Sequence, residues 1–254
     1  MCVASATAAP RKRRDPVLGL GVMLRASPTM LPYSPRSVAE ALHSALDEAA
    51  ASRGRATLAI PGGRSPGAVL SALAGLCNPW LRERLHLLWL DERAVPVGHP
   101  DRNDGPTLAA WRSGGDLPAF VHPMPAEAPD LDAAAAAYAA TLAEATGGGP
   151  LDAALVGIGE DGHLASLFPD HPGLSDLSPV FAVTDSPKPP PRRLTMGLTV
   201  IRTCPMIAVL ALGEAKGRIL ARSRKGPDPS LPCSLLPSGA TVWYADDAAV
   251  VAAG

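Results

Sequence analysis

His163 is the most informative candidate for chemistry in this sequence. It lies in the segment GIGEDGHLASLFP at residues 157–169, among three glycines and two residues after Asp161. Glycine leaves the backbone free to bend and to approach a ligand closely, and a neutral imidazole is a suitable general base near pH 7. An isolated histidine is more often structural. In a glycine-rich loop at the end of a predicted strand, the catalytic and structural interpretations are closer to even. In the catalytic one, Asp161 would orient the loop or the ring.

A second segment, PGGRSPG at residues 61–67, has the Gly-x-Ser-x-Gly spacing of a hydrolase nucleophile elbow. In such an elbow the backbone N–H after the serine helps to bind the oxyanion, but Pro66 follows Ser65 and has no N–H. We therefore expect a turn that binds an anion such as phosphate, with Ser65 capping the next helix and Pro66 in its first turn. A serine esterase remains a formal alternative. The residues of the turn are Gly62, Gly63, Arg64 and Ser65.

Four cations could contribute to the same anion site, since a phosphate needs several partners. Arg93 follows Asp91 and Glu92 directly, and it could instead only neutralise them. Lys188 and Arg193 lie in the segment DSPKPPPRRLT, where the prolines stiffen the chain and lower the entropic cost of aiming a cation. A solvated basic loop is the usual alternative for that segment. The fourth cation, Lys216, lies one turn into a predicted helix.

These chemical groups follow apolar runs that predict strands. The predicted strands are 21–24, 57–60, 86–90, 153–157, 180–184, 207–212 and 241–244, and the predicted helices are 36–51, 67–76, 131–145 and 215–222. Several strands are apolar throughout, as in sheets covered on both faces. The alternation predicts an α/β fold: a mostly parallel, Rossmann-like sheet with helices on both faces. Such sheets bind ligands at the carboxyl ends of their strands. We therefore expect the five chemical segments that follow these strands to meet at one edge of the sheet: 61–65, 91–93, 157–169, 185–195 and 213–220.

Composition excludes several classes of function. Of the 254 residues, 47% are hydrophobic, and the formal net charge of −1 indicates neither a nucleic-acid partner nor a membrane surface. No apolar run approaches the roughly 20 residues that span a bilayer. The four cysteines lack metal-ligand spacing, which predicts free thiols in a cytoplasmic protein without a metal. We expect a disordered tail over residues 1–20 and a single domain over residues 21–254, as a monomer or weak homodimer.

The motifs, taken in order, resemble those of the 6-phosphogluconolactonases over residues 36–249. The segments are PGGRSP, LLWLDERAVP, HPDRND, GIGEDGHLASLFP, SPKPPPRRLT, LGEAKGRIL and LPCSLLP. The resemblance implies an ester hydrolase of the oxidative pentose phosphate pathway that converts 6-phospho-D-glucono-1,5-lactone to 6-phosphogluconate without a cofactor. It implies His163 as the base that activates water, and Arg93 is the leading cation for the oxyanion. Substrate contacts are expected from Gly62, Gly63, Arg64, Ser65, Asp91, Lys188, Arg193 and Lys216.

Three positions depart from the pattern expected of this family. Pro61 stands where serine or threonine is common, Arg102 where serine is usual, and Cys233 in place of alanine. The first two could alter loop hydrogen bonds near the substrate.

Two other classes of function remain open at this point. An amino-sugar-phosphate isomerase or deaminase would use a carboxylate base such as Asp91, but those enzymes resemble Asp-Glu-Tyr where this chain has Asp-Glu-Arg93. A non-catalytic sugar-phosphate sensor would keep the cations and would have no need of His163.

Overall fold

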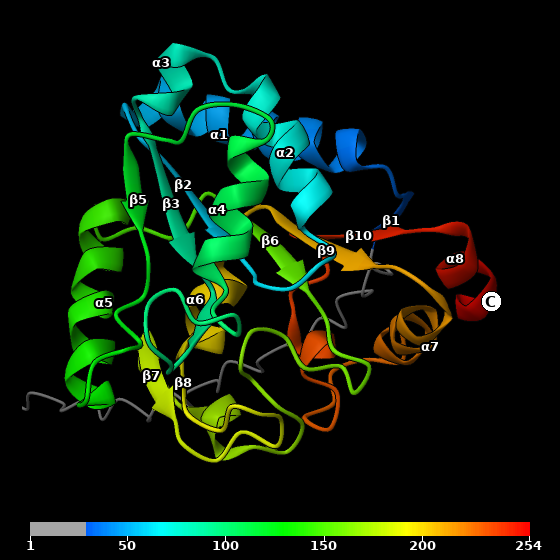
Figure 1. Cartoon of the computed structure of the whole chain (residues 1–254). Coiled ribbons are helices and arrows are strands. Elements are labelled where there is room, and N and C mark those ends of the chain that lie inside the picture. The colour runs from blue at the N-terminus through cyan, green and yellow to red at the C-terminus, as the bar shows by residue number, and fades with distance from the viewer. Residues whose placement is uncertain (1–28) are drawn as a thin grey trace, which may run out of the picture.

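The computed structural model describes residues 29–254, so the predicted tail and the predicted strand 21–24 lie outside the described residues. A seven-stranded sheet forms the centre, in the order β1-β10-β9-β6-β2-β3-β5, and every neighbouring pair is parallel (Figure 1). Its strands are β1 (Thr29–Pro32), β2 (Ala56–Ile60), β3 (Leu85–Trp89), β5 (Phe120–His122), β6 (Ala153–Gly157), β9 (Ile207–Ala211) and β10 (Thr241–Ala245). The predicted α/β class with a mostly parallel sheet is confirmed.

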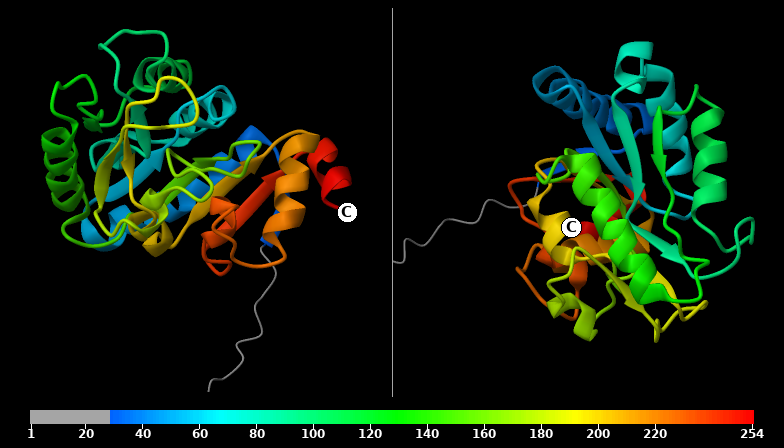
Figure 2. Two further views of the ribbon diagram at one scale, coloured as in Figure 1. Left: turned by 90° about the horizontal axis from the view of Figure 1, so that it is seen from below. Right: turned by 90° about the vertical axis from the view of Figure 1, so that its left-hand side faces the viewer.

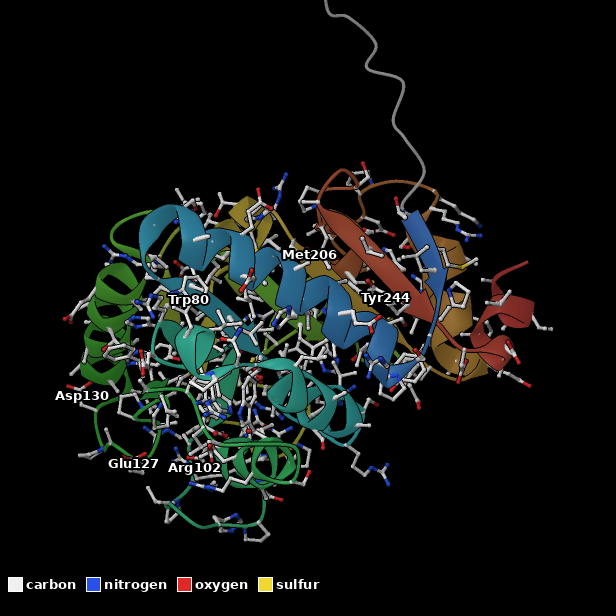
Figure 3. All side chains as sticks on the ribbon, turned by 90° about the horizontal axis from the view of Figure 1, so that it is seen from above. Trp80, Arg102, Glu127, Asp130, Met206 and Tyr244 are labelled. Carbon is white, nitrogen blue, oxygen red and sulfur yellow. The ribbon has the colours of Figure 1, made fainter. Side chains whose placement is uncertain are left out.

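Helices cover both faces of this sheet, as predicted. The helices are α1 (Pro35–Arg53), α2 (Gly67–Leu76), α3 (Pro79–Arg82), α4 (Asp104–Arg112), α5 (Leu131–Thr146), α6 (Leu198–Thr203), α7 (Glu214–Ser223) and α8 (Asp247–Ala253), with 3₁₀ turns at Pro172–Ser175 and Pro232–Leu235. Helix α1 lies across one face next to α2 (Figure 3), and α5 and α7 lie on the other face. Helices α5 and α8 lie at opposite ends of the molecule (Figure 2).

Local sequence explains where most of these helices begin and end. Ser34 caps α1 through a reciprocal capping box with Ser37, and Asp130 caps α5. Gly147 ends α5 in the left-handed conformation, with φ of 65°. The expected cap of α2 by Ser65 is wrong, because Pro66 itself holds the cap position and its carbonyl accepts the N–H of Leu70. Ser65 is therefore left exposed in the preceding turn.

A second, antiparallel sheet contains β4 (Asp91–Arg93), β8 (Arg193–Met196) and β7 (Val180–Val183). The expectation that the strand at 180–184 belongs to the parallel sheet is therefore wrong. The segment after β7 returns directly to β8, whereas a parallel neighbour would need a long crossover connection. Four of the five chemical segments thus follow parallel strands. The fifth reaches the same edge through β8, which pairs with β4 just beyond the carboxyl end of β3.

The order of the strands reverses between β2 and β6. From β2 the chain proceeds to β3 and β5 on one side, and from β6 it proceeds to β9 and β10 on the other. Such a reversal leaves a crevice at the carboxyl ends of the two central strands, where α/β proteins bind ligands. The glycine turn after β2 and the His163 loop after β6 therefore begin on neighbouring strands.

Candidate active site

His163 forms a close pair with Asp161 in the loop after β6. The His163 Nδ1 atom lies 2.5 Å from Asp161 Oδ1, and Lys188 Nζ lies 3.0 Å from Asp161 Oδ2. The carboxylate accepts the Nδ1 hydrogen, so a neutral His163 keeps its lone pair on Nε2. This geometry supplies a base that is oriented by a carboxylate, and the carboxylate is itself held by a cation.

The electrostatic environment keeps this imidazole neutral. Burial is the largest influence on the pKa of His163 and, together with the charge of Lys188, lowers it although Asp161 raises it. Burial alone would raise the pKa of Asp161, but the charge of His163 and hydrogen bonds from His163 and Lys188 bring it down to about 2. Near pH 7 the pair therefore consists of a neutral imidazole and an ionised carboxylate.

Gly159 is the backbone feature that allows this pair to form. A Cβ at this position would lie 2.0 Å from His163 Nδ1 and 2.3 Å from Asp161 Oδ1. Only glycine lets the two side chains lie against the backbone here. On its other side the His163 ring contacts Phe168, with 4.9 Å between ring centroids and a tilt of 40°.

Lys216 belongs to the same group of side chains. It donates from Nζ to the carbonyl of Ile158, at the start of the His163 loop, and burial lowers its pKa. Glu160, Asp161 and Lys188 are its charged neighbours. Lys188 Nζ thus lies 3.3 Å from His163 Nδ1, and Lys216 binds the start of the same loop.

Arg93 and Arg193 lie directly opposite each other on the antiparallel strands β4 and β8. The buried Arg193 donates to the carbonyls of Lys188, Pro189 and Pro190 at 2.9, 3.1 and 3.0 Å, so its guanidinium holds the loop that carries Lys188.

The Arg93 guanidinium has no carboxylate partner within residues 29–254. Its Nη1 donates to the carbonyl of Asp101 at 2.7 Å, and its buried Nε has no partner. The alternative that Arg93 merely neutralises Asp91 and Glu92 is thus unsupported by any ion pair in the described chain. Like charges that face each other across strands repel, so the position beside Arg93 favours an anion.

Asp91 is a buried carboxylate that contacts Ser166, Arg193 and Asn103. Its Oδ2 accepts a hydrogen bond from Ser166 Oγ at 2.6 Å and lies 3.9 Å from Arg193 Nη1. Its Oδ1 accepts a longer bond, 3.3 Å, from the Asn103 amide. Each carboxylate oxygen of Asp91 therefore accepts one hydrogen bond within the protein.

The glycine turn after β2 lies against the side chain of Asn103. A Cβ on Gly62 would lie 1.7 Å from Asn103 Oδ1, so the amide occupies the space that any other residue would need. Gly63 has φ of +92°, and Arg64 and Ser65 are exposed. No hydrogen bond of the described residues joins the Ser65 hydroxyl to a base, so a serine nucleophile is not supported.

The structure thus groups the predicted residues in three clusters around one sheet edge. His163, Asp161, Lys188 and Lys216 form the first; Arg93, Arg193 and Asp91 form the second; and the turn 62–65 forms the third. Asn103 and Phe168 were not predicted as site residues, although both lie inside the motifs HPDRND and GIGEDGHLASLFP.

Residues 29–254 contain neither a metal-binding cluster nor a membrane-spanning helix. No group of three or more His, Cys, Asp or Glu side chains there could hold a metal ion. In the same range, no helix has both the length and the apolar character needed to cross a membrane.

Comparisons with known proteins identify the family of this chain. The family model described as glucosamine-6-phosphate isomerases/6-phosphogluconolactonase matches residues 34–243. A 6-phosphogluconolactonase of Streptomyces coelicolor is 39% identical, with 80% of this chain and 84% of the relative covered. A 6-phosphogluconolactonase of Mycobacterium tuberculosis is 38% identical, with 81% and 88% covered.

Solved structures agree as well. The crystal structure of 6-phosphogluconolactonase from Thermotoga maritima superposes with a TM-score of 0.76 at 25% identity, over 86% of this chain and 98% of that one. A monomeric glucosamine-6-phosphate deaminase shares the fold at 20% identity, with a TM-score of 0.70 over 88% of this chain and 98% of that one. The parallel sheet, the clusters at its edge and the family match over most of the chain lead to one conclusion: the chain belongs to the glucosamine-6-phosphate isomerase/6-phosphogluconolactonase family.

Proposed function

We propose that this chain is a 6-phosphogluconolactonase, which hydrolyses 6-phospho-D-glucono-1,5-lactone to 6-phosphogluconate. Relatives at 38–39% identity carry that name. The observation that carries the proposal is the His163–Asp161 pair at 2.5 Å, which leaves the His163 Nε2 lone pair available while Lys188 pairs with Asp161 and Lys216 binds the start of the same loop. A neutral base next to cations suits the addition of water to the carbonyl of an anionic substrate.

In the proposed reaction, His163 Nε2 removes a proton from water as the water oxygen attacks C1 of the lactone. The carbonyl electrons move to its oxygen, and Arg93 together with backbone N–H groups stabilises this oxyanion. When the oxyanion collapses, the bond between C1 and the ring oxygen breaks. The imidazolium returns its proton to that oxygen, and the product carboxylic acid then ionises.

The remaining cations would hold the phosphate and fix the lactone in one register. Lys188 lies beside His163, Lys216 binds the start of the His163 loop, and the turn at 62–65 would add backbone N–H groups and Arg64. In this proposal Arg193 acts indirectly, because its nitrogens hold the carbonyls of the Lys188 loop. Asp161 orients His163.

The deaminase alternative finds less support in the geometry. It needs a carboxylate base, and both oxygens of Asp91 already accept hydrogen bonds from Ser166 and Asn103. The similarity to the solved deaminase is a similarity of fold. A sensor without activity would not require the ordered pair of His163 and Asp161.

Hydrolysis of the lactone by the purified protein tests this proposal. The assay is best run at slightly acidic pH, where the spontaneous reaction is slower, with the protein omitted as the background. We expect rapid, saturable hydrolysis and no release of ammonia from glucosamine 6-phosphate. Ammonia release without lactone hydrolysis would replace the proposal with the deaminase activity. The cytoplasmic location and the monomeric or weakly dimeric state remain predictions.

A further inference from the structure

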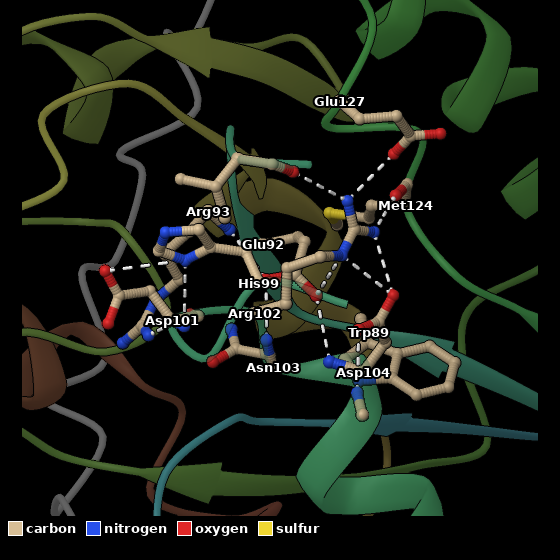
Figure 4. Close-up of polar contacts among 12 residues, drawn as sticks. Trp89, Glu92, Arg93, His99, Asp101, Arg102, Asn103, Asp104, Met124 and Glu127 are labelled. Carbon is tan, nitrogen blue, oxygen red and sulfur yellow. Dashed lines mark hydrogen bonds and ion pairs between the residues drawn. The ribbon is translucent and has the colours of Figure 1, made fainter. Parts of the chain in front are cut away.

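A buried guanidinium organises the segment between β4 and α4. Arg102 is 3% exposed, and all three of its nitrogens donate hydrogen bonds (Figure 4). Nε donates to Asp104 at 2.9 Å, Nη1 donates to Glu127 at 2.8 Å and to the Val95 carbonyl at 3.1 Å, and Nη2 donates to the Met124 carbonyl at 3.0 Å. Arg102 thereby ties its own loop to the segment that precedes α5.

Glu92 lies beneath this guanidinium and is fully buried. Its carboxylate lies 3.9 Å from Arg102 Nε and accepts three backbone N–H groups: from Arg93 at 2.7 Å, from Asn103 at 2.7 Å and from Asp104 at 3.0 Å. A buried carboxylate is costly unless it is paired and hydrogen-bonded. Arg102 and the three N–H groups offset part of that cost, although burial still raises the pKa of Glu92.

The two neighbours of Arg102 in the chain both reach the candidate active site. Before it, the Asp101 carbonyl accepts a hydrogen bond from Arg93 Nη1 at 2.7 Å, which is the one side-chain hydrogen bond of Arg93 in the described structure. After it, the Asn103 amide donates to the Asp91 carbonyl at 2.8 Å and contacts the turn at Gly62. Fixing the backbone at Arg102 therefore fixes a contact on each side.

We propose that Arg102 is a positioning residue for this site: it holds the Asp101 carbonyl and the Asn103 amide where they aim Arg93 and support the glycine turn. Its link to turnover rests on the proposed lactonase function. The orientation of Arg93 can also be tested without turnover, by measuring the affinity for the product 6-phosphogluconate. Lysine cannot replace this arginine, because an ammonium lacks the planar fork that donates in several fixed directions.

A cycle of variants separates this role from a purely structural one. The variants are Arg93→Lys, Arg102→Lys and the double variant, with Arg82→Lys as the control because Arg82 pairs with Asp116 in another part of the fold. The readouts are kcat and KM for the lactone and the Kd for 6-phosphogluconate. If Arg102 acts through Arg93, Arg102→Lys changes the same parameter as Arg93→Lys, by about tenfold, and the double variant is no worse than Arg93→Lys alone.

Three results would decide against the proposal. Additive losses in the double variant, unchanged kinetics and binding in Arg102→Lys, or an equal loss in Arg82→Lys would each show that Arg102 only stabilises the fold. If Arg102→Lys does not fold, Glu127→Gln removes one contact from the half-exposed end of the network and should move the same parameter by about two- to threefold. If the wild type binds 6-phosphogluconate without hydrolysing the lactone, the lactonase proposal fails, and the binding cycle still decides the role of Arg102.

Discussion

Replacing Gly159 with alanine should disable the site without disturbing the rest of the fold. The new Cβ would lie 2.0 Å from His163 Nδ1, whereas ordinary contacts begin near 3.4 Å, so the ring must move by roughly 1.4 Å. Asp161 Oδ1 lies 2.3 Å from the same Cβ and must move as well. A displacement of about 1 Å at a reacting group can cost about a hundredfold in rate. We therefore expect kcat to fall by ~10²-fold.

The assay compares lactone hydrolysis and 6-phosphogluconate binding in Gly159→Ala, Gly239→Ala and the wild type. Gly239 is the matched control, because a Cβ there meets nothing within 4 Å and its φ is not positive. We expect Gly239→Ala to behave as wild type, and Gly159→Ala to bind the product while losing turnover. If Gly159→Ala kept more than half of the wild-type kcat, the close packing of His163 and Asp161 would not matter for catalysis.

Further predictions concern the ionisation of the site and the rejected nucleophile. Because burial lowers the pKa of His163 and the base must be neutral, kcat/KM should be constant near pH 7 and fall only below the ordinary histidine value of about 6.5. Asp161 raises that pKa, so Asp161→Asn should lower kcat and move the acid limb to lower pH; a shift to higher pH would contradict the arrangement. Ser65→Ala should keep kcat within about twofold of wild type, because Ser65 neither caps α2 nor contacts a base; trapping an acyl group on Ser65 by mass spectrometry would refute this.

Most strands of the parallel sheet could be predicted, because each is a short run of apolar residues that is visible in the sequence without knowledge of its partners. The apolar runs that form β2, β6 and β9 stand out in the sequence, and capping residues mark α1 and α5. By contrast, β4 consists of three polar residues, Asp91–Arg93, with no hydrophobic period to reveal it. Its strand conformation depends on pairing with β8, about 100 residues later.

The same distinction applies to the site. His163 and Asp161 are two residues apart, so their pairing could be anticipated from the glycine-rich segment around them. The contact of Asn103 with Gly62 joins residues about 40 positions apart, and no spacing rule predicts it.

Arg193 shows most clearly which features of the site the sequence alone does not predict. Its sequence context in a basic loop predicts a substrate contact, which stays a prediction. The sequence does not show that Nε and Nη2 donate to carbonyls of that same loop, while Nη1 lies 3.5 Å from Ser166 Oγ. The sequence shows which residue is a cation and which predicted strand or loop carries it. Its hydrogen-bond partners depend on how the chain folds.

The most direct test of the central claim is the turnover of His163→Asn, measured together with its affinity for 6-phosphogluconate. Asparagine retains an N–H that can donate toward Asp161 but provides no base, and loss of a general base typically costs ~10²–10⁴-fold in rate. We predict a fall in kcat/KM for the lactone within that range, with product affinity changed less than about threefold. Turnover above half of the wild-type value in a correctly folded variant would contradict the assignment of His163 as the base.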